Sequence, residues 1–310
     1  MYRLGVDLGG TKFSLGLLDE NAGVVCRREA KLAGNKEPAA VLGAIRRELA
    51  GALAESGISA GRIISCGVGV PGTIRGDGET VAKAPNLGWE NVPAGRMFTE
   101  LTGVRCRLIQ DSRAAAYGEY AAGNGRGKRI VVCVTLGTGL GTGIVMNGEV
   151  FAGALGNAGE MGHIPAVPDG RPCGCGKRGC LEKYAAGLGL DITAEELYGP
   201  GHTAADIFDG AGRGDERALA GLDEAVRMLG QAMVALVNLI SPDCLLFSGG
   251  MSAREKLFVR PLIEYIKTRC YSASGDDTPY MALAALGPDA PMVGAALYAA
   301  KFIGEQTYGR

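Results

Sequence analysis

Three cysteines and one of the chain's two histidines lie close together near the middle of the sequence. They form the pattern His163-x9-Cys173-x-Cys175-x4-Cys180. One imidazole and three thiolates make a complete tetrahedral donor set for zinc, and a set closed to water is typical of a structural site. The spacing differs from that of common zinc fingers, and a Cys-x-Cys pair can also be a redox or an adventitious site. The residues alone leave these alternatives open.

Glycine-rich turns follow strand-like apolar runs at three places. They comprise Asp7, Gly9, Gly10, Thr11 and Lys12 in "DLGGTK", then Gly137, Thr138 and Gly139 in "LGTGLGTG", then Gly249 and Gly250. Glycine lets the backbone approach a phosphate closely, and the exposed N–H groups can bind an anion. A carboxylate at the end of the preceding strand can hold Mg²⁺ through water. One such turn is more often an ordinary hairpin, but three of them favour a nucleotide-phosphate site.

The segment "GVGVPG" at residues 67–72 matches the glycine pattern of dinucleotide-binding proteins. That pattern requires a helix to begin at the glycines. The next residues, "TIRGDGETV", are too rich in glycine and β-branched residues for a helix. We therefore predict that this segment binds no dinucleotide.

The elements that must position these residues follow an α/β pattern that occurs twice. Apolar runs and turns predict three strands over residues 2–30, a helix over 37–56 and a buried strand over 62–72. Residues 129–151 repeat the strand, glycine turn and hairpin, and a long helix (214–240), a strand (244–248) and a last helix (291–306) follow. We predict two α/β domains of one type. The smaller comprises residues 1–117 plus 292–310, and the larger comprises residues 118–291.

Length and charge limit the possible functions. A chain of 310 residues is long enough for two domains, and 32 basic against 33 acidic residues give a formal net charge of −1. Without a long basic run we predict no nucleic-acid partner. No signal peptide and no stretch of 18 apolar residues are present, so we predict a cytoplasmic protein without a membrane partner. The odd cysteine count, nine, argues against a disulfide framework.

The motifs "DLGGTK", "GVGVPG", "PNLGW", "LGTGLGTG", "GEMGH" and "CGCGKRGCLE" occur in this order over most of the chain. Through these motifs the chain resembles the ROK family of sugar kinases and sugar-responsive repressors, and the glucokinase-like branch of that family in particular. The resemblance implies a duplicated ribonuclease H-like fold of the actin/hexokinase type, with two domains and an interdomain cleft. It implies ATP and Mg²⁺ as cofactors, held by the paired glycine turns, and a homodimer or homotetramer.

The resemblance also assigns the site residues. Asp111, in "LIQDSRAAAYGEY", would accept the proton of the sugar hydroxyl, although an aspartate at this place is also typical of a helix N-cap. The sugar ligands would be Gly72, Asn86, Gln110, Asp111, Glu160, His163 and Glu182. Structural Zn²⁺ would be bound by His163, Cys173, Cys175 and Cys180, and would fix the ring of His163 toward the sugar.

The segment around Asp111 departs from the family pattern. The family has Asn before the aspartate and Ala-Asn after it, whereas this chain has Gln110, Ser112 and Arg113. Gln110 keeps the amide but is one methylene longer, so its contact with a sugar hydroxyl would shift. Arg113 would add a cation near the cleft. The departure bears on which sugar is bound and on the rate.

These observations predict an ATP-dependent hexose kinase that acts on the 6-hydroxyl, with glucose as the first candidate. N-acetylmannosamine, N-acetylglucosamine and fructose are the alternative sugars. A ROK repressor is a rival of another class, but "DLGGTK" begins at residue 7 and leaves no room for a DNA-reading domain. A non-catalytic sugar binder is the third possibility, because of the altered residues beside Asp111.

Overall fold

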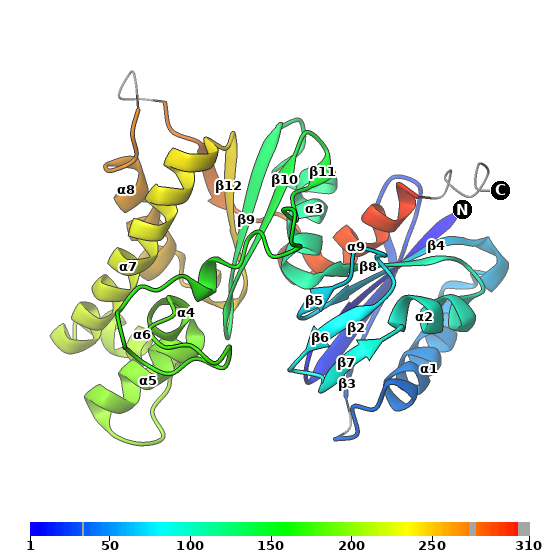
Figure 1. The fold of residues 1–310 in the computed structure, drawn as a ribbon, viewed down its shortest axis with the longest axis horizontal. Coiled ribbons are helices and arrows are strands. Elements are labelled where there is room, and N and C mark those ends of the chain that lie inside the picture. Colours follow the sequence, from blue (N-terminus) through cyan, green and yellow to red (C-terminus); the bar gives the residue numbers. More distant parts are fainter. Residues whose placement is uncertain (33, 273–276, 303–310) are drawn as a thin grey trace. The chain divides into compact units, whose positions relative to one another are not determined.

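The computed structural model describes residues 1–32, 34–272 and 277–302, which form two units (Figure 1). Unit 1 comprises Met1–Gly127, Gly143–Ala158 and Pro288–Arg310, and unit 2 comprises Lys128–Thr142 and Gly159–Gly287. The chain therefore passes between the units several times, and the last segment returns to the first unit.

Unit 1 contains a five-stranded sheet in the order β3-β2-β1-β4-β8. Its strands are β1 (Tyr2–Leu8), β2 (Lys12–Leu18), β3 (Val24–Lys31), β4 (Ile63–Val70) and β8 (Cys106–Gln110). The first three pair antiparallel, as tight turns between them require, and β1, β4 and β8 are parallel. Helix α1 (Pro38–Ser56) packs one apolar stripe, including Val41, Ile45 and Leu49, into the core of this unit.

The second sheet repeats this order as β11-β10-β9-β12-β13. Its strands are β9 (Ile130–Leu136), β10 (Leu140–Met146), β11 (Glu149–Val150), β12 (Cys244–Ser248) and β13 (Tyr280–Leu283). Strands β9, β12 and β13 are parallel, and the Asn147-Gly148 turn joins β10 to β11 with positive φ at both residues. The repeated order confirms the predicted duplication and the predicted fold class.

Further strands and helices complete the two units. They are β5 (Thr73–Ile74), β6 (Val81–Ala84), β7 (Trp89–Val92), α2 (Ala94–Thr102), α4 (Glu182–Ala185), α5 (Gly187–Tyr198), α6 (Ala204–Gly212), α7 (Glu216–Ile240) and α8 (Arg260–Lys267). Helix α7 confirms the long helix expected over 214–240. The segment "GVGVPG" leads into strand β5, so no helix begins there, as predicted.

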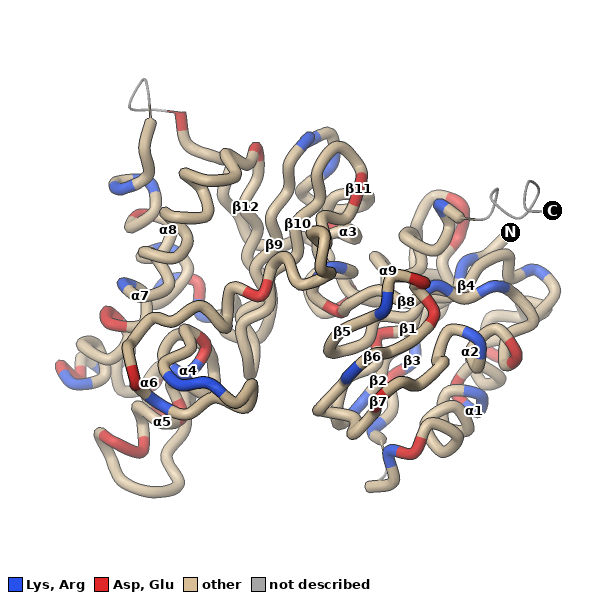
Figure 2. Tube along the Cα trace, in the orientation of Figure 1, with Lys and Arg blue, Asp and Glu red and all other residues tan. Residues whose placement is uncertain are grey.

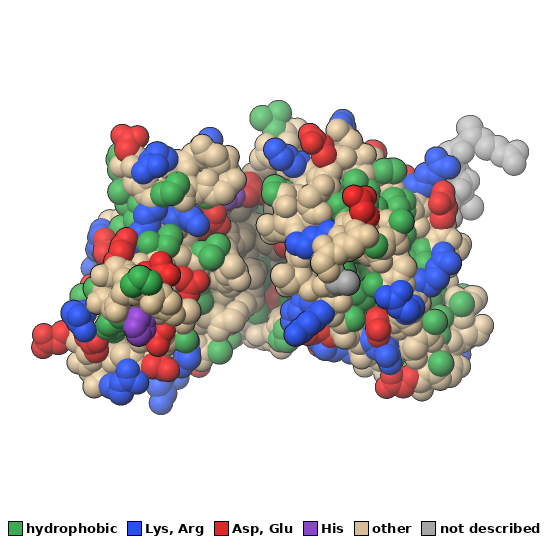
Figure 3. Space-filling view, turned by 90° about the horizontal axis from the view of Figure 1, so that it is seen from below, with side chains coloured by type: hydrophobic (Ala, Val, Ile, Leu, Met, Phe, Trp, Pro, Cys, Tyr) green, Lys and Arg blue, Asp and Glu red, His purple; other side chains and the backbone are tan. Residues whose placement is uncertain are grey.

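The surfaces of both units carry charges of both signs. Basic and acidic residues are interspersed along the chain trace (Figure 2). On the face drawn in Figure 3, charged side chains of both signs alternate with apolar ones. Among the described residues, no helix combines the length and the apolar character needed to cross a lipid bilayer.

The last helix, α9 (Ala290–Ala300), packs in backbone contact with β1, β4 and α3 (Asp111–Ala122). Side chains built on Gly5 and Gly67 would overlap the carbonyl oxygens of Met292 and Ala295, one turn apart on α9. A side chain on Gly294 would overlap the carbonyl oxygen of Ala114 in α3. Glycine is therefore required on both sides of α9. The helix expected over 291–306 ends at Ala300, and its residues from 303 onward lie outside the described residues.

We expect Gly294→Ala to lower the free energy of unfolding by at least about 2 kcal/mol, because its methyl group has no space beside the backbone of α3. Urea titration followed by circular dichroism measures the change. Gly43→Ala is the matched control, since no atom lies within 4 Å of a methyl group built there. That control should raise stability by about 0.5–1 kcal/mol as a better helix former, and an equal effect of the two variants would contradict the packing argument.

Candidate functional site

The candidate site of unit 1 lies at the carboxyl ends of its parallel strands. Asp7 in β1 pairs with Gly69 in β4, which in turn pairs with Ile109 in β8. The three strands therefore end at the same edge of the sheet, the place where ligands bind in open α/β sheets. Asp7 lies near this end of β1 and Asp111 directly follows β8, and the negative charge of Asp111 contributes to the raised pKa of Asp7.

Asp7 is half-buried beneath this edge. Burial and the nearby negative charge of Asp111 raise its pKa to about 7, although Lys12 acts in the opposite direction. Two carboxylates this close repel each other, and a divalent cation bound near them would relieve that repulsion. The pair therefore suits a magnesium-nucleotide ligand.

Asp111 is the first residue of α3, and Gln110 occupies the N-cap position. The N-cap alternative for Asp111 is therefore wrong, because the helix begins one residue earlier than that alternative requires. One carboxylate oxygen of Asp111 accepts a hydrogen bond from the backbone N–H of Ser112 at 2.7 Å. This bond fixes the orientation of the carboxylate at the start of the helix.

The first glycine turn contacts the "PNLGW" segment directly. The backbone N–H of Gly9 donates to the carbonyl of Lys12 at 2.9 Å, and a methyl group on Gly10 would lie 3.1 Å from Cβ of Asn86. The Lys36 ammonium donates to the carbonyl of Asn86 at 2.9 Å. Asn86 is thus exposed but held from two sides, which places a predicted sugar ligand beside a predicted phosphate turn.

Other predicted ligand residues of unit 1 have a position that the surface or a turn explains. The side chain of Lys12 pairs with Glu29 at 3.1 Å on the surface, and Thr11 is exposed. Gly72 has φ of +97°, and a side chain there would overlap the carbonyl of Lys83, so the turn itself requires glycine. Gln110 is half-buried at the end of β8.

The other two glycine turns lie next to each other in unit 2. Strands β9 and β12 are parallel with Thr135 opposite Ser248, so the turns that follow them meet at one edge. A side chain on Gly249, whose φ is +88°, would overlap the carbonyl of Leu136. The carbonyl of Gly137 accepts a hydrogen bond from the backbone N–H of Gly187 at 2.9 Å, which ties this turn to the start of α5.

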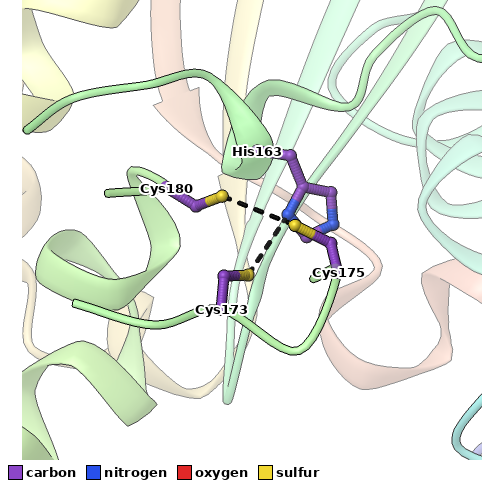
Figure 4. Close-up of side chains that lie close together, drawn as sticks. All are labelled: His163, Cys173, Cys175 and Cys180. Carbon is purple, nitrogen blue, oxygen red and sulfur yellow. Dashed lines mark hydrogen bonds between the residues drawn. The ribbon is translucent and has the colours of Figure 1, made fainter. Parts of the chain in front are cut away.

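His163, Cys173, Cys175 and Cys180 converge on one point of unit 2 (Figure 4). All four ligand atoms lie within 4.8 Å of one another. The His163 Nδ1–Cys173 Sγ distance is 3.7 Å and the Cys175 Sγ–Cys180 Sγ distance is 3.6 Å. A tetrahedron around zinc with Zn–S bonds of about 2.3 Å has edges of about 3.8 Å. The four residues therefore fit a zinc ion in both donor type and spacing.

Two carboxylates flank the histidine of this cluster. Glu182, the first residue of α4, accepts a hydrogen bond from the Cys173 thiol at 3.0 Å and lies 3.7 Å from Nδ1 of His163. Glu160 lies 4.0 Å from the other ring nitrogen, Nε2. A methyl group on Gly139 would lie 3.1 Å from Glu182, so the cluster also borders the second glycine turn.

Some residues of these sites carried no sequence signal. Gly187 follows an ordinary Ala-Ala pair, and Lys36 lies in a polar loop. Gly187 donates its backbone N–H to the carbonyl of Gly137, and Lys36 donates its side-chain ammonium to the carbonyl of Asn86. Contacts of this kind depend on the folded chain and leave no residue pattern.

Known proteins resemble this chain in sequence and in structure. The profile of the ROK family matches residues 3–301. A glucokinase of Streptomyces coelicolor is 33% identical over 310 residues, covering 94% of this chain and 96% of that protein. An N-acetylmannosamine kinase of Escherichia coli is 33% identical over 258 residues, covering 82% and 85%. A ROK family glucokinase from Streptomyces griseus, solved in complex with glucose and AMPPNP, matches with a TM-score of 0.80 at 31% identity, covering 97% and 100%.

The raised pKa of Asp7 predicts a pH-dependent cost in stability. The folded protein binds this proton more tightly than the unfolded chain, so stability is lost as pH rises from about 4 to about 7. Asp7→Asn removes the titration. We expect its gain in unfolding free energy over the wild type to be larger at pH 8 than at pH 4.5, by on the order of 1–3 kcal/mol. Urea titrations at both pH values, without magnesium or nucleotide, measure this difference. The same gain at both pH values would contradict the prediction.

Proposed function

The chain belongs to the ROK family and is an ATP-dependent sugar kinase, and we propose that it is a glucokinase acting on the 6-hydroxyl of glucose. The observation that carries this proposal is the carboxylate pair Asp7 and Asp111 at one edge of the unit 1 sheet. One carboxylate would face the magnesium-nucleotide and the other the alcohol. The relative from Streptomyces griseus, whose structure holds glucose and AMPPNP, supports both ligands.

Phosphoryl transfer to an alcohol requires a proton acceptor and compensation of phosphate charge. We propose that Asp111 accepts the proton of the sugar hydroxyl, oriented by its hydrogen bond with the Ser112 N–H. The glycine turns at Gly9–Gly10, Gly137–Gly139 and Gly249–Gly250 would bind the phosphates through backbone N–H groups. Bound magnesium would neutralise phosphate charge, and Asp7 would orient it through water.

We propose that the sugar is bound by Asn86, Gln110, Glu160, His163 and Glu182. At Gly72, the absence of a side chain would let the backbone approach the sugar closely. The support is that Glu160 lies 4.0 Å from Nε2 of His163 and Glu182 lies 3.7 Å from Nδ1, so both carboxylates flank the imidazole. Carboxylates beside an imidazole can accept bonds from neighbouring sugar hydroxyls and so read their stereochemistry. The relative from Escherichia coli supports N-acetylmannosamine as the second candidate sugar.

We propose that the His163 cluster holds a structural zinc ion. Its four donors leave no position for water or substrate, so the metal would not take part in the chemistry. It would instead fix the ring of His163 and the loop that leads to Glu182, because Nδ1 faces the cysteine thiols and Nε2 faces Glu160. We further propose that the enzyme works in the cytoplasm as a homodimer or homotetramer.

A sugar panel tests the proposed function. Coupled assays with ATP and glucose, mannose, fructose, N-acetylglucosamine or N-acetylmannosamine should give the highest kcat/KM for glucose. Asp111→Asn should lower kcat by about a hundredfold or more, with little change in sugar affinity. An N-acetylhexosamine as best substrate would exclude glucose. Sugar binding without turnover in the wild type would indicate a non-catalytic binder, and an unchanged kcat in Asp111→Asn would exclude Asp111 as the base.

Metal analysis tests the zinc proposal. The wild type should contain zinc at a near-equimolar ratio, and Cys180→Ser should lose it, with weaker sugar binding and a lower melting temperature. Cys26→Ser is the control, since Cys26 is also buried but lies outside the cluster. A Cys180→Ser protein that kept its full zinc content would exclude the ligand assignment.

A further inference from the structure

Arg113 is one of the few charged side chains buried in unit 1. It lies on the first turn of α3, two residues after Asp111, and is only 9% exposed. Burying a guanidinium is costly unless its donors are satisfied, so its partners show what the residue does.

The guanidinium binds the backbone of a distant loop. Its Nη2 atom donates to the carbonyl of Gly156 at 2.7 Å and to the carbonyl of Ala158 at 2.9 Å. The next residue, Gly159, is where the chain leaves unit 1, and Glu160 and His163 follow. Arg113 therefore holds the residues that lead directly into the proposed sugar ligands.

This loop has little conformational preference of its own. Gly153, Gly156 and Gly159 all have positive φ, and no helix or strand forms between residues 151 and 160. Glycine-rich segments lose more backbone freedom on ordering than others, so their conformation depends on external contacts. Within the loop, the Ala158 N–H donates to the carbonyl of Ala152 at 2.9 Å. Arg113 adds two bonds from outside.

The position of Arg113 is itself well fixed. Strand β10 packs against the first turn of α3, close to it in Figure 1, because a side chain on Gly143 would overlap the carbonyl of Ser112. The same side chain would lie 2.9 Å from Cα of Arg113. The helix that begins with Asp111 and the loop that precedes Glu160 are therefore linked through one rigid contact and one buried side chain.

We propose that Arg113 is a positioning residue for sugar recognition: it fixes residues 156–158 and thereby the start of the segment that carries Glu160 and His163. This inference rests on the proposed sugar-binding role of those two residues. A single terminal nitrogen reaches both carbonyls from a buried stem, so the ammonium of a lysine could replace part of this contact.

Arg113→Met and Arg113→Lys test the inference by steady-state kinetics and by calorimetric titration of sugar. Loss of both bonds should raise the KM and Kd for the sugar about tenfold or more. The KM for ATP and the zinc content should change little, and Arg113→Lys should recover part of the affinity. Arg3→Met is the matched control, since Arg3 also donates to two carbonyls, those of Asp19 at 2.8 Å and Glu20 at 3.3 Å, outside the proposed sugar ligands.

The outcomes distinguish a failure of the proposed role of Arg113 from a failure of the proposed kinase function. If Arg113→Met only lowers the melting temperature, as Arg3→Met does, with unchanged sugar Kd, the residue is structural and the inference is wrong. If Arg113→Met does not fold, Arg113→Lys decides by its own sugar Kd. Sugar binding without turnover in the wild type would overturn the kinase proposal, while the Kd comparison would still decide the role of Arg113.

Discussion

The backbone contact of α9 with β1, β4 and α3 is the constraint on which unit 1 depends. Gly5 and Gly67 on the strands, and Gly294 on the helix, allow main chains to touch where any side chain would separate them. Helix α3, which begins with Asp111, is held against α9 by this contact, while the pairing of β1, β4 and β8 brings Asp7 to the same edge. Glycine at these three positions therefore keeps the elements that carry Asp7 and Asp111 closely packed.

Each unit is built on the same arrangement of strands and turns. Parallel strands in register bring their carboxyl ends to one edge, and glycines in the following turns expose backbone N–H groups there. In unit 1 the edge carries Asp7 and Asp111, and in unit 2 it carries the turns at Gly137 and Gly249. The duplicated order of strands explains why the glycine turns that we propose to bind phosphate occur in both units. The raised pKa of Asp7 shows that the edge is built at some cost to the ligand-free protein.

Much of this was predictable from local sequence. Strand runs, the Asn147-Gly148 turn, helix α7 and the His163 cluster follow from periodicity, turn chemistry and donor type. The partners of Lys12 and Arg113 were not, because Glu29 and the loop at Gly156 are brought near only by the folded chain. The N-cap position of Gln110 was missed because it depends on where β8 ends, and no residue marks that end.

The return of α9 to unit 1 has a consequence for biosynthesis. The sheet of unit 1 is translated first, but the helix that covers it spans Ala290–Ala300, after unit 2 has been made. A nascent chain on the ribosome therefore carries an uncovered glycine-lined sheet while unit 2 can already fold. Truncation near the C-terminus would remove a core element rather than a tail, and early termination products should be targets for chaperones and proteases.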